Sequence, residues 1–249
     1  MTTDERPIGV FDSGVGGLSV LRAIRDLLPH ESLIYVADSA HAPYGDRDAS
    51  FITDRAVALS EFLVDFGVKA IVVACNTATV VAVDLLRARF QLPIVALEPA
   101  IKPAAAMSRT GVVAVLGTSR TLQSPSVRRL CERHAGPVRV LLQPCPGLVE
   151  RVECGALDDE TTLRLLESYV RPVVDAGADT IVLGCTHYPF LAPQIRALAG
   201  ESVTLLDSAD AVARQVQRKV TPAGPLRSGA EAPISFFTTG DPGQATVMF

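Results

Sequence analysis

Short apolar runs alternate along the first part of the chain with longer stretches in which apolar residues recur every three or four positions. The runs predicted to form buried strands are residues 8–12, 32–38, 69–75 and 93–97. The stretches predicted to form helices are 18–28, 48–66 and 77–90. This alternation is typical of a parallel sheet with helices on both faces.

The same pattern begins again after residue 110. Further strands are predicted at 111–118, 138–144, 179–185 and 203–207. Helices are predicted at 121–134, in the stretch up to about 176 and after Tyr188. Residues 221–233 contain several Gly and Pro residues and predict a linker, after which 234–241 predict a last strand.

An internal correspondence links the two halves of the chain. When Cys185 is aligned with Cys75, further identical pairs come into register: Asp65 with Asp175, Gly67 with Gly177, Ile71 with Ile181, and Val72 with Val182. We therefore predict an α/β fold of two similar three-layer domains with mostly parallel sheets and an active site in the cleft between them. The first domain is predicted to comprise 1–97 and 208–249, and the second 98–207.

Composition and charge argue against several classes of protein. With 249 residues, of which 48% are hydrophobic, the chain is large enough for a substantial core. Its net charge of −4 and its scattered Lys and Arg residues argue against a nucleic-acid partner. Neither a signal peptide nor a transmembrane helix is expected, and five cysteines, an odd number, do not suggest a disulfide framework. We expect a cytoplasmic protein with free thiols and no membrane partner.

Cys75 and Cys185 are the residues most indicative of chemistry, because each follows a predicted strand at the end where ligands bind in open α/β sheets. A lone cysteine is more often a small apolar residue of the core, and we keep that interpretation for Cys131, Cys145 and Cys154. Two thiols at matching places in matching halves make core filling a poorer explanation for this pair.

Three functions are open to the two thiols. A metal site or a redox pair would favour spacings such as CxxC, which the chain lacks. Acid–base chemistry at carbon fits better, since a thiol has a reference pKa of about 8.5 and becomes a usable base after modest tuning. Two thiols facing each other across a cleft could remove a proton from one face of a substrate and deliver one to the other.

The loops beside the two cysteines are polar but carry few charges. The segment FDSGVGG is an incomplete dinucleotide loop, because Ser19 stands where the last glycine would be. Asp12 is therefore interpreted as a helix cap, as a partner for an ammonium group, or as a residue that orients a thiol. His187, two residues after Cys185, could exchange a proton with that thiol or lower its pKa. The neutral hydrogen-bonding groups around the cysteines are Asn76, Thr77, Thr118, Thr121 and Thr186.

Taken together, these segments resemble the glutamate racemases of the cofactor-independent aspartate/glutamate racemase family. The motifs that carry the resemblance are IGVFDSGVGGLSV, DSAHAPYGDR, VVACNTAT, CPGLVE, VECG, LGCTHYP and FFTTGD, which extend over nearly the whole chain. The resemblance implies a two-domain α/β enzyme that racemises glutamate for peptidoglycan synthesis without a cofactor or metal. It also implies a homodimer.

The resemblance further implies roles for individual residues. Cys75 and Cys185 would be the two bases, and Asp12, Glu153 and His187 would tune them. The substrate would lie among Asp12, Ser13, Tyr44, Gly45, Asn76, Thr77, Thr186 and His187, with Thr118 and Thr121 close by.

Several alternatives stay open at the level of sequence. Glu150 is close enough to Glu153 to be the acidic residue meant, and Arg120 replaces a glycine of the family's loop, which leaves the role of Thr121 open. An aspartate racemase, or a decarboxylase or isomerase of the same fold, is the nearest alternative function. A binding protein with two α/β lobes is the alternative from a different class. Lysines occur only at 69, 102 and 219, none in a strand-end motif suited to a Schiff base.

Overall fold

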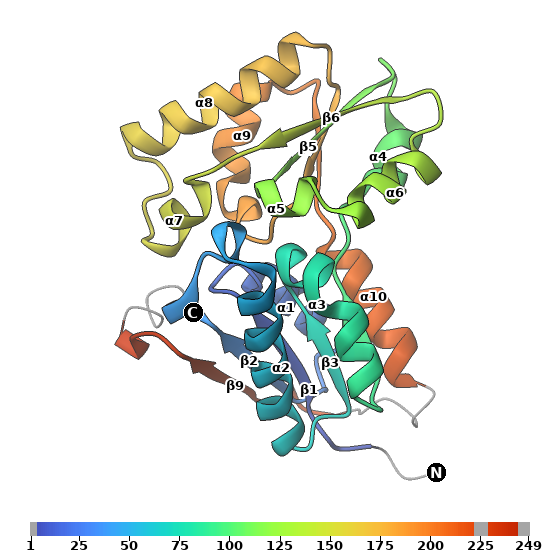
Figure 1. Ribbon diagram of the computed structural model, residues 1–249, viewed down its shortest axis with the longest axis vertical. Helices are drawn as coiled ribbons and strands as arrows, with labels where there is room; N and C mark the ends of the chain where they lie inside the picture. The colour runs from blue at the N-terminus through green and yellow to red at the C-terminus, as the bar shows by residue number, and fades with distance from the viewer. Residues whose placement is uncertain (1–3, 222–228, 244–249) are drawn as a thin grey trace. The chain divides into compact units, whose positions relative to one another are not determined.

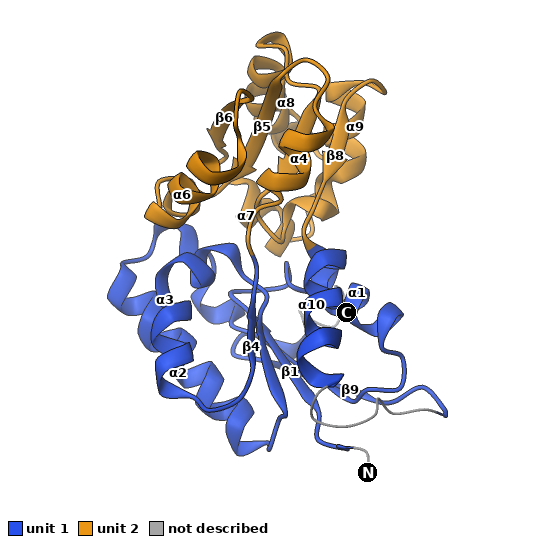
Figure 2. Cartoon of the chain, turned by 90° about the vertical axis from the view of Figure 1, so that its right-hand side faces the viewer, with its two compact units in different colours: residues 1–97, 209–249 blue, residues 98–208 orange. Residues whose placement is uncertain are grey.

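The computed structural model describes residues 4–221 and 229–243. The chain divides into two compact units: unit 1 comprises residues 1–97 and 209–249, and unit 2 comprises residues 98–208 (Figure 2). Most of the predicted linker and the end of the predicted first domain, residues 222–228 and 244–249, lie outside the described residues.

Unit 1 contains a five-stranded sheet in which every pairing is parallel (Figure 1). Its strands, in spatial order, are β4 (Ile94–Ala96), β3 (Ala70–Val73), β1 (Ile8–Asp12), β2 (Leu33–Ala37) and β9 (Ile234–Thr238). Because successive side chains of a strand point to opposite faces, Val10 and Val72 belong to one core, whereas Phe11 and Val73 belong to another. The sheet is therefore buried on both faces.

In the described part of unit 1, four helices cover these two faces, which gives three layers. Helices α1 (Leu18–Leu27) and α10 (Ala209–Val220) pack on one face, and α2 (Ala49–Asp65) and α3 (Asn76–Arg89) on the other. Two short 3₁₀ turns, η1 (Ser39–His41) and η2 (Tyr44–Asp46), follow β2. Helix α10 was not predicted, although Val212 and Val216 have helical spacing and are buried against α1.

Unit 2 contains a four-stranded parallel sheet. Its strands, in spatial order, are β6 (Arg139–Pro144), β5 (Val112–Gly117), β7 (Thr180–Leu183) and β8 (Thr204–Leu206). Its helices are α4 (Ile101–Met107), α5 (Ser119–Leu122), α6 (Pro125–His134), α7 (Leu148–Glu153), α8 (Glu160–Asp175) and α9 (Ala192–Ala199), with the 3₁₀ turn η3 (Tyr188–Leu191) before α9.

The single helix predicted at 121–134 is wrong, since α5 ends at Leu122 and α6 begins at Pro125. The local chemistry explains the break. The Ser124 hydroxyl accepts a hydrogen bond from the Val127 amide at 3.2 Å, which makes Ser124 the cap of a new helix. Pro125 has no amide hydrogen to continue the preceding helix and suits the first position of the next one.

The two sheets share one topology, as the internal correspondence predicted. The order β4-β3-β1-β2 in unit 1 corresponds to β8-β7-β5-β6 in unit 2, and unit 1 adds β9 beyond β2. Gly67 and Gly177 follow α2 and α8 at positive φ angles of 70° and 92°, which glycine adopts at little cost. The predicted fold class, α/β with parallel sheets in two similar units, is confirmed, while the cleft between them stays a prediction.

Helices that are both long and apolar enough to cross a membrane are absent from residues 4–221 and 229–243.

Candidate active site

The polar residues singled out in the sequence gather at the carboxyl ends of the strands in each unit. In unit 1, Asp12 ends β1 and Cys75 follows β3. In unit 2, Thr118 follows β5 and Cys185 follows β7. Parallel strands end at the same edge of their sheet, so each unit carries its own polar cluster there.

The Cys75 thiol lies at the start of α3. Its sulfur accepts a hydrogen bond from the Ala78 amide at 3.4 Å and lies 3.7 Å from the Ser13 hydroxyl oxygen. The thiol thus occupies the capping position of a fourteen-residue helix, where unpaired amides and the helix dipole favour negative charge. Such a setting favours a thiolate.

Asp12 lies beside this thiol's partner, Ser13. Its Oδ1 atom accepts hydrogen bonds from the Ser13 amide at 2.6 Å and from the Ser13 hydroxyl at 3.2 Å. The interpretation of Asp12 as a helix cap is wrong, because α1 begins at Leu18 and its capping residue is Gly17. A side-chain carbon at Gly17 would lie 2.8 Å from the Asp12 Cβ and 2.9 Å from the Tyr35 hydroxyl, so this glycine permits close packing around Asp12.

Asn76 and Thr77 begin α3 and are both buried. Within the described part of the chain, the side-chain oxygen of Asn76 is buried without a hydrogen-bond partner. A buried amide oxygen left in this state costs free energy, and a ligand with an N–H group would satisfy it.

In unit 2, Cys185 is the first member of a chain of three polar side chains. Its sulfur lies 3.8 Å from Nδ1 of His187, and Nε2 of His187 lies 2.5 Å from Oε1 of Glu153. An ionised carboxylate can only accept, so Nε2 carries the hydrogen, and Nδ1 of the neutral ring presents a lone pair toward the thiol. His187 is 1% exposed, which leaves its ring oriented by these partners.

Glu150 and Glu153 differ in their surroundings on α7. Glu150 is exposed, whereas Glu153, one turn further along, reaches His187. Spacing in the sequence could not separate the two residues, because both precede the same turn.

The threonines of unit 2 differ in their surroundings. The Thr118 hydroxyl donates to the Thr121 hydroxyl at 2.9 Å and accepts from the Thr121 amide, so Thr118 caps α5. Thr121 is fully buried, whereas Thr118 is 9% exposed. Thr186, which stands between Cys185 and His187 in the sequence, is also buried.

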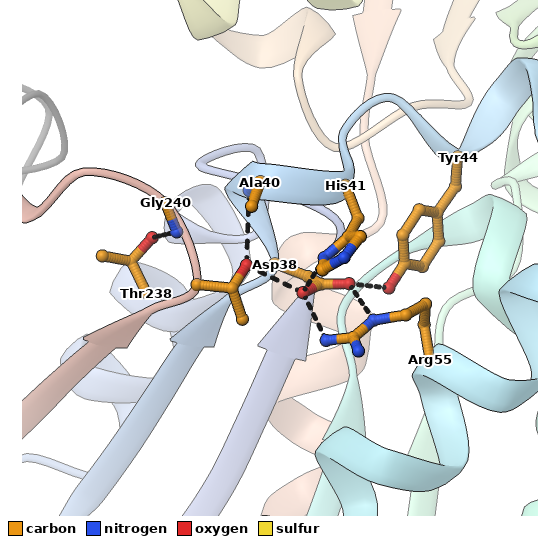
Figure 3. A network of polar contacts seen from close by, with 8 residues as sticks. Asp38, Ala40, His41, Tyr44, Arg55, Thr238 and Gly240 are labelled. Atoms are coloured by element: carbon orange, nitrogen blue, oxygen red, sulfur yellow. Dashed lines mark hydrogen bonds and ion pairs between the residues drawn. The ribbon is translucent and has the colours of Figure 1, made fainter.

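Tyr44 and Gly45 belong to the turn η2. The phenol hydrogen of Tyr44 is already used in a hydrogen bond. Its hydroxyl donates to Oδ2 of Asp38 at 2.5 Å (Figure 3). Burial, together with the charge of Asp38, raises the pKa of the Tyr44 phenol far above its usual value of 10.0. Tyr44 therefore stays protonated at neutral pH.

Asp38 is a residue that the sequence reasoning missed. It follows β2 as Asp12 ends β1, and its amide donates to the Asp12 carbonyl at 3.0 Å. The available signal was this position: an acidic residue at the carboxyl end of a predicted strand next to that of Asp12.

The environment of Asp38 predicts a loss of stability in acid. Burial by itself would raise the pKa of the Asp38 carboxyl, but hydrogen bonds from Arg55, Tyr44, Thr239 and His41 outweigh it and hold the pKa below the usual 3.8. The folded state therefore binds this proton more weakly than the unfolded state. The stabilisation is fully present above pH 3.8 and is lost as the pH falls through the lower pKa of the folded protein.

Replacing Asp38 by Asn should remove this titration and leave the Arg55 guanidinium without its counter-charge. We expect the free energy of unfolding at neutral pH to fall by about 3 kcal/mol. Its dependence on pH below about 4 should also become shallower. Urea unfolding at several pH values measures both effects, with the exposed Asp46, changed to Asn, as the control. Equal stability of the two variants would contradict the prediction.

Comparison with known proteins assigns a family to this geometry. A family model described as Asp/Glu/Hydantoin racemase matches residues 8–216. The chain belongs to this racemase family. The resemblance seen in the sequence is thereby confirmed, and so is the predicted enzyme class, an isomerase.

Relatives in this racemase family match along nearly their whole length. The chain is 53% identical over 242 residues to a glutamate racemase of Ectopseudomonas mendocina, with 97% of this chain and 92% of the relative covered. A crystal structure of Escherichia coli glutamate racemase in complex with L-glutamate and the activator UDP-MurNAc-ala matches with a TM-score of 0.86 at 33% identity, covering 98% of this chain and 92% of that one. Francisella tularensis glutamate racemase in complex with D-glutamate matches with a TM-score of 0.84 at 27% identity, with the same coverage, 98% and 92%.

Proposed function

We propose that this racemase interconverts L- and D-glutamate, with Cys75 and Cys185 as two opposed bases, and so supplies D-glutamate for peptidoglycan. The observation that carries the proposal is the equivalence of the two thiols. Each follows the corresponding strand of the same topology, β3 or β7, and each has its own group able to favour a thiolate. The resemblance to glutamate racemases adds the substrate.

In unit 1, the amino end of α3 would stabilise the charge of the Cys75 thiolate. The Asp12 carboxylate, which accepts from the Ser13 hydroxyl, would take up the thiol proton through that hydroxyl. In the direction in which Cys75 acts as the base, the thiolate takes the α-proton of the substrate. Cys185, as a thiol, then delivers a proton to the opposite face of the carbon. The reaction returns each sulfur to the protonation state it needs for the reverse direction.

In unit 2, the imidazole of His187 would take the proton of Cys185 at Nδ1 to give a thiolate and an imidazolium. Glu153 stabilises the imidazolium through Nε2. The two thiols are thus activated by different devices, a helix terminus for Cys75 and a histidine–carboxylate pair for Cys185. Each of these two devices must make its own sulfur competent to take an α-carbon proton that is far less acidic than a thiol.

The developing negative charge on the substrate requires donors placed before the reaction begins. We propose that Ser13, Asn76, Thr77, Thr186 and the turn at Tyr44 and Gly45 supply them, with Thr118 and Thr121 nearby. The Asn76 side-chain oxygen, buried and unpartnered among the described residues, would accept from the substrate ammonium group. A site placed between the two units, as the sequence predicts, would let closure exclude water.

The proposal does not involve a Schiff base. Lys69 precedes β3, at the strand end opposite Cys75, and its ammonium forms a buried ion pair with Glu31 at 2.5 Å. It also donates to the Asp4 carbonyl at 2.8 Å. These partners give Lys69 a structural role at the far edge of the sheet.

The deciding experiment is to incubate the purified protein, without added cofactor, with L-glutamate and with D-glutamate. We expect each enantiomer to be converted until the two are equal, as followed by chiral chromatography or optical rotation. Absence of conversion in both directions would reject the proposed function.

Substrate choice gives a second expected result. We predict that kcat/KM for aspartate is lower than that for glutamate by about a hundredfold or more, because the shorter acid leaves buried polar groups unpaired. The two acids can be compared in the same assay. Comparable values would favour the alternative of an aspartate racemase.

The proposal also includes a homodimer in the cytoplasm. The five cysteines are free, as expected in a reducing compartment. Light scattering at several protein concentrations would measure the oligomeric state, and a monomer throughout would exclude the dimer.

A further inference from the structure

The carboxylate of Asp38 accepts five hydrogen bonds. The donors to Oδ1 are His41 at 2.9 Å, Arg55 at 2.8 Å and Thr239 at 2.9 Å. The donors to Oδ2 are Tyr44 at 2.5 Å and Arg55 at 2.9 Å. Figure 3 shows the side chains of His41, Tyr44 and Arg55 converging on the carboxylate. With both oxygens occupied and no exposed surface, Asp38 is poorly suited to proton transfer with a substrate.

These donors come from segments that lie far apart in the sequence. His41 and Tyr44 belong to the two short turns after β2, Arg55 to α2, and Thr239 to the residues after β9. Thr239 makes three contacts: its amide donates to the Ala37 carbonyl at 3.0 Å, and its hydroxyl accepts from the Ala40 amide at 3.3 Å and donates to Asp38. Thr239, just after β9, therefore holds the loop that carries Tyr44.

The same residues connect two motifs, of which the proposed mechanism uses only the turn at Tyr44 and Gly45. The segment DSAHAPYGDR contains Asp38, His41 and Tyr44, and FFTTGD contains Thr239. Gly240, next in the second motif, packs closely on the first, since a side-chain carbon there would lie 3.1 Å from the Ser39 Cβ. The two motifs thus meet at one carboxylate.

We propose that Asp38 is a positioning residue, which uses Arg55 and the C-terminal Thr239 to fix the loop of residues 39–46 so that the backbone of Tyr44 and Gly45 meets the substrate. The inference rests on the proposed racemisation of glutamate. It assigns to the residues after β9 a part in substrate binding that they exert through Asp38, without touching the substrate. Loosening the network should weaken binding more than it slows chemistry.

Thr239 offers a clean test, because it is exposed and its replacement disturbs little packing. Thr239→Val keeps the shape of the side chain and the backbone bond to Ala37 but removes the hydroxyl. We expect KM for both enantiomers of glutamate to rise about fivefold, while kcat stays within about twofold of the wild-type value. Thr239→Ser keeps the hydroxyl and should restore KM.

Thr238→Val is the matched control, since within the described residues the Thr238 hydroxyl accepts a hydrogen bond from the Gly240 amide and makes none to Asp38. Its KM should match the wild-type value. A role confined to stability would lower the melting temperature of Thr239→Val without changing KM. That result, or a Thr239→Ser variant as impaired as Thr239→Val, would overturn the inference.

A second variant tests the route through Asp38. Tyr44→Phe removes a donor on the other carboxylate oxygen and keeps the ring. If both residues act by holding the same loop, the rise in KM of the double variant should be smaller than the product of the single rises. Independent, multiplying effects would contradict a shared network.

Measurements on the wild-type protein distinguish a failure of the positioning role of Asp38 from a failure of the proposed racemisation. Titration calorimetry with D-glutamate gives a binding constant that does not depend on turnover. A wild-type protein that neither binds nor racemises glutamate would overturn the proposed function and the inference together. A wild-type protein that does both, while Thr239→Val matches Thr238→Val, would overturn the inference alone.

Discussion

Replacing either Cys75 or Cys185 by serine is expected to reduce the racemisation of glutamate by about a thousandfold or more. A serine hydroxyl near neutral pH is too weak a base to take the α-proton, and in the proposed mechanism each turnover uses both sulfurs, one as base and one as acid. Loss of either should therefore stop the overall reaction in both directions. Chiral chromatography of the product measures this loss directly.

The two variants should nevertheless differ, because each keeps one competent thiol. The resemblance to glutamate racemases assigns D-glutamate to Cys75 and L-glutamate to Cys185. In deuterated water, Cys185→Ser should therefore exchange the α-hydrogen of the D form only, and Cys75→Ser that of the L form only. Nuclear magnetic resonance of each recovered enantiomer would report the exchange.

Cys131→Ser is the matched control for these variants. Cys131 lies on α6, half-buried and apart from the carboxyl ends of the strands, so its replacement should leave racemisation unchanged. If Cys75→Ser or Cys185→Ser racemised at a comparable rate, or if both exchanged the same enantiomer, the two cysteines would not be opposed bases. At least one of them would then be a residue of the core.

The strands and the positions of the two thiols could be predicted because they depend on local patterns. A buried parallel strand is a short apolar run, and the residue at which the run turns polar marks its carboxyl end. The alignment of Cys185 with Cys75 anticipated the shared topology for the same reason, since identical runs and glycines fix equivalent strands and turns.

Contacts between segments distant in the sequence could not be predicted. Asp38 and Thr239 are separated by most of the chain, and only the parallel pairing of β9 with β2 brings them together. The selection of Glu153 over Glu150 likewise depends on which face of α7 meets His187. The break between α5 and α6 was visible locally as a serine followed by proline, but the apolar periodicity concealed it.

The second large effect is expected at the pair formed by His187 and Glu153, the last residue of helix α7. His187→Ala removes the group that would accept the Cys185 proton, and we expect kcat to fall about a hundredfold while KM changes by less than about threefold. Glu153→Gln keeps the shape of its side chain but loses the charge that stabilises the imidazolium. A fall in kcat of about tenfold is expected. Steady-state rates with both enantiomers measure these changes.

Glu150→Gln is the matched control on the same helix, and its exposed side chain predicts unchanged kinetics. The assignment to Cys185 can be tested further in the single-thiol proteins. His187→Ala should reduce the exchange of L-glutamate by Cys75→Ser, in which Cys185 is the remaining base, but should hardly affect the exchange of D-glutamate by Cys185→Ser. An equal loss in both backgrounds would mean that His187 serves the substrate or the fold, and that the short path from Glu153 through His187 to Cys185 does not activate that thiol.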